Sequence, residues 1–288
     1  MDTILTGLLL GGTYALIAVG LQLQYGVARI MNLANGEMLV AGAFGAFWFF
    51  SAYKLSPFLS VFVSVPLAFC LNWAIYRFLM LPLVRRAKSD GQLEVDSILS
   101  TFGLAFVAVG VMVAAFGGEY FSYDYLARAV RILDSPYGLN RVVAFCFSAA
   151  VCTALYVWLN RTRAGLRIRA ISINPQAARL VGIDVQRLSA FAFAMGGALA
   201  AMGGASLSTF LTFDAFVGVI FTLKALVIVI MGGVTDMRGA ILAAFILGLA
   251  ETFVATHIDP GLTLAAAYAL FMLVLLFRPQ GIMGKRAS

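Results

Sequence analysis

Three ionisable residues, Glu37, Lys224 and Glu251, lie inside long apolar stretches of this sequence. A charge at the centre of a bilayer costs about 2.5–3.5 kcal/mol on insertion scales, so each residue is a candidate for ion binding or for contact with a polar solute. The structural alternative is an interhelical ion pair, or a lysine whose amine reaches the membrane surface. For Lys224 we favour that alternative, and for Glu37 we favour a position beside a solute path. For Glu251 we favour neither interpretation over the other.

Polar amides precede the first of these carboxylates. The stretch 25–37 contains Asn32, Asn35, two glycines and Glu37, with no hydrophilic loop around them. In lipid, irregular backbone is tolerated only where it is buried in protein or lines a water-filled cavity. The stretch therefore predicts a broken, partly re-entrant segment, whereas the glycine-rich stretch 231–239 is interpreted as a tight turn. The predicted transport-pathway residues are Asn32, Asn35, Glu37, Lys224 and Glu251.

The elements that position these residues follow from composition. Of the 288 residues, 62% are hydrophobic and 11% charged, whereas a soluble domain carries about 25% charged residues. A membrane-spanning helix needs about 20 mostly apolar residues. The apolar runs predict an all-α, polytopic transmembrane bundle of about nine spans, or about eight if the short last run is not one. The predicted spans are 3–25, 34–53, 57–80, 97–117, 140–160, 188–210, 217–235, 239–256 and 262–278.

The orientation follows from lysine and arginine in the loops, because cytoplasmic loops carry an excess of these residues. Basic residues follow the third run, fill the segment 161–187 and recur at Lys285 and Arg286. All three groups fall on one side if the runs alternate. We expect the N-terminus outside, the C-terminus in the cytoplasm, one transmembrane domain over 1–288, and 161–187 as a cytoplasmic loop. Because the cations sit in short loops, the net charge of +7 does not indicate a nucleic-acid partner.

The sequence has no sign of a catalytic or metal site. Its three cysteines lie apart in apolar runs, which favours neither a disulfide framework nor a metal cage. We find no paired carboxylates at hydrolytic spacing, no zinc-protease helix motif, no nucleophile elbow and no phosphate-binding loop. We therefore expect a chain that is not an enzyme and binds no cofactor or metal of its own.

The predicted cytoplasmic loop contains one short helix. Asn174 is a good N-cap, Pro175 suits the first helical position, and Gly182 is a natural terminator. A helix of about two turns is too short to stand alone in water, so it must dock on something. Sequence physics leaves open whether the support is a second protein or the end of the same bundle. The residues that offer close approach or apolar contact are Ala177, Ala178, Leu180 and Ile183.

Several motifs recur in order along nearly the whole chain. Gly11–Leu16 and Asn32–Glu37 lie early, whereas Lys224-Ala225, Gly232-Gly233 and Phe277–Gly281 lie late. Together they resemble the permease subunits of branched-chain amino acid ABC importers. In that family the second of these motifs usually has histidine at the position that Asn35 occupies here.

The resemblance implies the membrane permease of an ATP-driven importer in a bacterial inner membrane, carrying branched-chain or other small apolar or amide amino acids. It implies a second, related permease, two cytoplasmic ABC ATPases that hold ATP and Mg²⁺, and a periplasmic binding protein that delivers the small-molecule substrate. Gly165–Ile183 would contain the coupling helix that seats in an ATPase groove. The implied coupling residues are Arg169, Ala170, Asn174, Pro175, Ala177, Ala178, Arg179, Leu180, Gly182 and Ile183.

Two other transport hypotheses stay open at this point. The same family includes permeases for urea and short amides, and the binding protein sets much of the substrate specificity in such systems. A self-contained secondary transporter would instead use Glu37 and Glu251 as ion-binding carboxylates. Its uptake would collapse with an ionophore while ATP remains.

Overall fold

The structure is a computed structural model that describes residues 2–132 and 135–283. It is mostly helical, as predicted. Its helices are α1 (Asp2–Ala28), α2 (Asn35–Tyr53), α3 (Val61–Ile75), α4 (Leu81–Arg86), α5 (Asp90–Phe116), α6 (Leu139–Arg161), α7 (Arg163–Ile173), α8 (Pro175–Leu180), α9 (Val185–Leu207), α10 (Val217–Gly232), α11 (Met237–His257) and α12 (Thr263–Phe277). The short turns η1 (Pro57–Ser60) and η3 (Pro260–Leu262) precede α3 and α12, and the π-helical turn η2 (Tyr76–Met80) joins α3 to α4. Strands β1 (Ala129–Ile132) and β2 (Ser135–Gly138) pair antiparallel in a hairpin.

Seven helices among the described residues are long and apolar enough to cross a membrane. The other two predicted runs, 34–53 and 217–235, correspond to α2 and α10. Helix α10 has only 16 residues, and the first turn of α2 carries the polar Asn35 and Glu37. The structure is therefore a polytopic helical bundle, and the number of nine membrane crossings stays a prediction.

Two predicted boundaries were wrong. The third helical stretch continues through η2 and α4 to Arg86, so its basic residues lie on a helix and not in a loop. The fourth begins at Asp90, well before residue 97, because the Ser89 side chain caps it by accepting the backbone N–H of Gln92 at 3.2 Å. Both errors arose because charged residues were taken as the ends of helices, whereas helices can project beyond the apolar layer.

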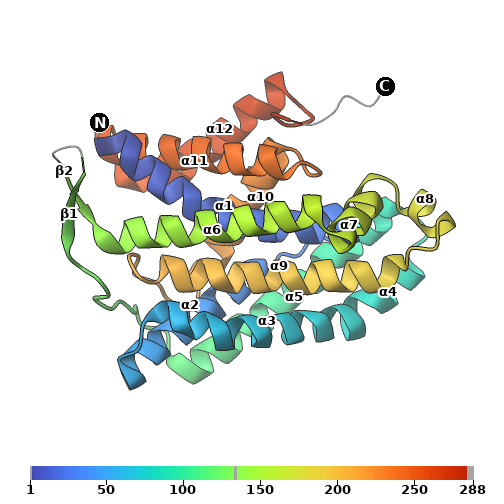
Figure 1. Cartoon of the computed structure of the whole chain (residues 1–288), viewed down its shortest axis with the longest axis horizontal. Coiled ribbons are helices and arrows are strands. Elements are labelled where there is room, and N and C mark those ends of the chain that lie inside the picture. The colour runs from blue at the N-terminus through green and yellow to red at the C-terminus, as the bar shows by residue number, and fades with distance from the viewer. Residues whose placement is uncertain (1, 133–134, 284–288) are drawn as a thin grey trace.

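Helix α1 forms the centre of the bundle, between α9 and α11 (Figure 1). Glycines allow this close packing. A Cβ added to Gly7 or Gly11 would lie 2.8 Å from a backbone Cα of α11, and one added to Gly20 would lie 2.7 Å from the carbonyl oxygen of Gly196 in α9. Gly7 and Gly11, four residues apart, thus form a packing surface of small residues, as is common between membrane helices.

We expect Gly204→Ala to destabilise the bundle, because the added methyl group would overlap the Leu39 carbonyl oxygen of α2. Overpacking of this kind costs about 1–3 kcal/mol. Gly110→Ala in α5 is the matched control, since nothing lies within 4 Å of its Cβ position. Thermal unfolding in detergent should show a lower midpoint for Gly204→Ala only. Equal midpoints for both variants would contradict the close α2–α9 contact.

The two ends of the bundle carry different elements. The β-hairpin and the start of α1 lie at one end, and α7 and α8 at the other (Figure 1). After α12 the chain returns to the C-terminal end of α10, where the N–H groups of Ile282 and Met283 donate to the carbonyl oxygens of Met231 and Gly232. Lys285 and Arg286, used above to orient the chain, lie outside the described residues. The orientation in a membrane stays a prediction.

Candidate functional site

The chain leaves helical geometry between α1 and α2, over residues 29–34. Side-chain hydroxyl groups from two other helices form hydrogen bonds with backbone groups of this break and of the residues that follow it. The Thr101 hydroxyl of α5 accepts the N–H of Leu33 at 3.1 Å and lies 3.1 Å from the Met31 carbonyl oxygen. The Thr222 hydroxyl of α10 accepts the N–H of Gly36 at 2.8 Å. The predicted break is therefore present, and it is buried in protein as lipid requires.

Asn32 helps to hold this break in place. Its amide nitrogen donates to the Gln24 side-chain oxygen at 3.1 Å, and its own side-chain oxygen accepts the N–H of Ala34 at 3.1 Å. Gln24 in turn donates to the Phe193 carbonyl oxygen of α9 at 2.9 Å. Asn32 thus has protein partners on both polar atoms and ties the break to α1 and α9.

Asn35 and Glu37, one turn further on, are fully buried and lack such partners. Among the described residues, none hydrogen-bonds to the side-chain nitrogen or oxygen of Asn35 or to either carboxylate oxygen of Glu37. The Glu37 carboxylate lies against Gly218 of α10, where an added Cβ would be 2.6 Å from Oε1. Buried polar atoms normally have partners. These side chains therefore offer donors and acceptors that a polar solute could use.

Lys224 and Glu251 form an ion pair between α10 and α11. The Lys224 Nζ lies 2.8 Å from Glu251 Oε2, and the Tyr14 hydroxyl of α1 donates to the same oxygen at 2.8 Å. The side chains of the lysine and glutamate are only 12% and 4% exposed. Lys224 thus forms the interhelical ion pair of the structural alternative, with Glu251 as its partner, and a place for either residue beside a solute path stays a prediction.

The cytoplasmic-loop helix predicted between Asn174 and Gly182 is α8. The Asn174 side chain accepts two backbone N–H groups of the first turn, each at 3.0 Å. At the other end Gly182 has a φ of +79°. The Ile183 N–H donates to the Ala178 carbonyl and the Gly182 N–H to that of Arg179, both at 3.1 Å. This is a Schellman motif. Both predicted helix ends are therefore confirmed.

The surroundings of α8 correct the prediction in two details, the helix α7 and the burial of Ala178, and they give Arg169 a partner on the bundle. The helix α7, which precedes α8, was not expected. Ala178 is buried in the main core, so it faces its own chain and not a partner. The Arg169 guanidinium turns toward α6, where it donates to Asn160 Oδ1 at 2.6 Å. What remains exposed on and after α8 includes Ala177, Leu180 and Val181.

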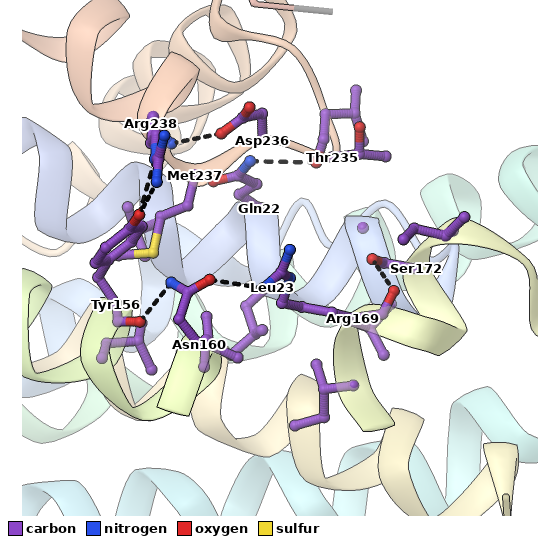
Figure 2. A pocket seen from close by; sticks show the side chains of 18 of the residues that line it. Gln22, Leu23, Tyr156, Asn160, Arg169, Ser172, Thr235, Asp236, Met237 and Arg238 are labelled. Atoms are coloured by element: carbon purple, nitrogen blue, oxygen red, sulfur yellow. Dashed lines mark hydrogen bonds between the residues drawn. The ribbon is translucent and has the colours of Figure 1, made fainter. Parts of the chain in front are cut away.

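A cavity of about 350 Å³ lies beside α7. Its walls come from α1, α6, α7 and the turn between α10 and α11, and Figure 2 shows its polar side chains. The lining includes Gln22, Asn160, Arg169, Ser172 and Arg238. Sequence reasoning missed this site. The signal that was available was the amide of Gln22 within the first apolar run, since polar side chains in membrane helices face protein or cavities.

The sequence matches, over residues 3–278, the family described as branched-chain amino acid transport system, permease component. It is 26% identical to the high-affinity branched-chain amino acid transport system permease protein LivH of Salmonella typhimurium, covering 99% of this chain and 96% of that protein. With BraD of Pseudomonas aeruginosa, described likewise, the identity is 27% at the same coverage. The autoinducer 2 import system permease protein LsrC of Salmonella paratyphi B is 26% identical over 54% of this chain and 46% of its own length.

The fold is also similar to that of a solved structure. PsaBC from Streptococcus pneumoniae in complex with Fab superposes with a TM-score of 0.53 at 13% sequence identity, covering 97% of this chain and 93% of that one. At that identity the likeness concerns the fold alone.

Proposed function

Because this chain belongs to the family of permease components of branched-chain amino acid transport systems, we propose that it is the permease subunit of an ATP-driven amino acid importer. Its substrates are branched-chain or other small apolar or amide amino acids. A second, related permease completes the passage, two cytoplasmic ABC ATPases bind ATP and Mg²⁺, and a periplasmic protein delivers the substrate. The chain itself carries out no catalysis and crosses a bacterial inner membrane with its N-terminus outside and its C-terminus in the cytoplasm.

The observation that carries this proposal is the surface of α8. The helix has six residues, too few to be stable without support, yet it is capped at both ends and anchored underneath by Ala178. Leu180 is 89% exposed and the adjoining Val181 is 74% exposed. Large apolar side chains exposed beside a rigid anchor are typical of a contact surface for another protein. We infer that an ATPase groove covers them.

A route for movement leads from α8 into the bundle. After the Schellman motif, the Asp184 side chain caps α9 by accepting the Arg187 N–H at 3.0 Å. Helix α9 then packs closely against α1 and, at Gly204, against α2. A displacement of α8 by a partner would therefore reach the α2 turn that carries Glu37. In this proposal, Asn35 and Glu37 contact the solute, Asn32 supports their segment, and Lys224 and Glu251 hold the neighbouring helices together.

We expect Glu37→Gln to reduce amino acid uptake several-fold without lowering the amount of protein in the membrane. The substitution keeps the shape of the side chain but removes the negative charge, which would attract the ammonium group of a solute or bind a proton. Uptake of labelled leucine by cells carrying the variant measures the effect. Glu119→Gln is the control, since Glu119 is exposed in the loop after α5. If Glu37→Gln took up leucine at the wild-type rate, the carboxylate of Glu37 would have only a structural role.

An assay that identifies the energy source of uptake tests the proposed function. Labelled leucine uptake should continue when an ionophore abolishes ion gradients and ATP is maintained, and it should stop when ATP is depleted. The reverse result would support an ion-coupled secondary transporter. Urea and acetamide, offered in the same assay, test the short-amide alternative, because preferential uptake of either would reject amino acids as the substrate class.

A further inference from the structure

We propose that the cavity beside α7 binds a small apolar amino acid from the cytoplasmic side, through its carboxylate, its ammonium group and its side chain. This inference rests on the proposed function for its substrate class, but it concerns a site separate from Glu37. The ligand occupying it would be the product of transport.

Two guanidinium groups provide the carboxylate-binding part of the site. Arg169 of α7 and Arg238 of α11 both line the cavity, and Figure 2 shows them reaching it from different elements. Arg169 donates to Asn160, and Arg238 donates to the Tyr156 hydroxyl both from Nε, at 2.8 Å, and from one terminal guanidinium nitrogen. The ion pairs found within the described residues involve neither of these arginines. Each therefore keeps N–H donors for a carboxylate, which planar guanidinium groups bind strongly.

A carboxylate in the same lining provides a place for an ammonium group. Asp236 uses Oδ1 to accept the backbone N–H of Arg238 at 2.9 Å, which caps α11. Its other oxygen has no hydrogen bond or ion pair to the residues that the structure describes. Two cations and one anion in one cavity leave an excess positive charge, so a free carboxylate group is bound in preference to a free amine.

The remaining wall is apolar. Leu23 of α1, Leu159 of α6 and Ile168 of α7 line the cavity. Its volume of about 350 Å³ is at the small end of ligand pockets, which span about 300–1,000 Å³. A lining that combines charged groups with branched aliphatic side chains matches an amino acid with a small apolar side chain. A bare inorganic anion would leave this apolar wall without a partner.

Occupancy of this cavity would affect transport. Its walls belong to α7, which leads directly into α8, and to α1 and α11, which form the centre of the bundle. A ligand bridging these elements would favour one relative position of the coupling segment and the bundle, because a ligand stabilises the conformation that it binds best. The consequence is slower import when the product accumulates in the cytoplasm.

The test uses the purified transporter complex, without its periplasmic protein, and labelled L-leucine as the probe. We expect saturable binding that Arg169→Gln and Arg238→Gln each weaken by at least about tenfold, as loss of a charge-assisted hydrogen bond would. Leucinol, which lacks the carboxylate, should not compete. Arg86→Gln, the same substitution at an exposed cytoplasmic arginine of α4, should bind like the wild type.

A second readout separates this inference from the proposed function. In cells preloaded with leucine, the wild type should import more slowly than in starved cells, and both cavity variants should lose that difference. Leucine uptake without arginine-dependent binding would overturn the cavity assignment and leave the proposed function intact. Competition by inorganic phosphate as strong as that by leucine would also overturn it, because charge alone would then decide binding. Absence of leucine uptake from starved cells would reject the proposed function itself.

Discussion

Replacement of Ala177 by tryptophan is expected to abolish uptake while the amount of protein in the membrane stays unchanged. Ala177 lies on the exposed part of α8, in the first turn capped by Asn174. A tryptophan there has room in the isolated chain but would hold an ATPase away from the helix. Overpacking costs about 1–3 kcal/mol even where neighbours can relax, so we expect uptake to fall by more than about tenfold.

Two further variants make the result specific. Lys88→Trp places the same side chain at another exposed position, in the connection after α4, and should leave uptake unchanged. Ala178→Trp should instead lower the amount of protein, because Ala178 is only 3% exposed and lies in the core. Immunoblotting of membranes alongside uptake separates the two kinds of loss. Normal uptake by Ala177→Trp would reject α8 as the coupling element.

Removal of the lysine from the buried ion pair is expected to be the most destabilising single change. In Lys224→Met, Glu251 keeps its hydrogen bond from Tyr14 but loses its cation, and its Oε1 already has no partner among the described residues. Breaking a buried pair by removing one partner costs about 3–5 kcal/mol. Less protein in the membrane and a lower unfolding temperature in detergent should both be measurable.

A double variant tests whether the unpaired charge of Glu251 is the cause of the lost stability. With Lys224→Met, the further change Glu251→Gln removes the unpaired charge and should restore most of the lost stability, because Tyr14 can still donate to the glutamine oxygen. Arg187→Gln breaks a pair whose side chains are 86% and 53% exposed, so it should have little effect. If Lys224→Met were fully stable and yet inactive in uptake, the lysine would belong to the transport mechanism.

Much of the architecture could be predicted from local patterns. The caps of α8 at Asn174 and Gly182 depend on neighbouring backbone, so residue type and spacing were sufficient to place them. The break before Glu37 was equally visible, because asparagine and glycine within apolar sequence have few structural explanations.

Features that depend on distant residues could not be predicted. The threonines that satisfy the break, Thr101 and Thr222, lie far along the chain, and hydroxyls are common in membrane helices. The pairing of Lys224 with Glu251 depends on the register between α10 and α11. The burial of Ala178 and the contact of Arg169 with α6 depend on how α7 and α8 fold back onto the bundle. The cavity that Arg169 lines depends on four separate elements.

The most direct test of the central proposal is purification of the tagged chain from its native membrane in mild detergent, with mass spectrometry of what accompanies it. We predict that two ATPase subunits with phosphate-binding loops and a second permease co-purify with the chain. The Ala177→Trp variant should keep the permease and lose the ATPases. Recovery of the wild-type chain alone, or only with copies of itself, would contradict an ATP-driven importer coupled through α8.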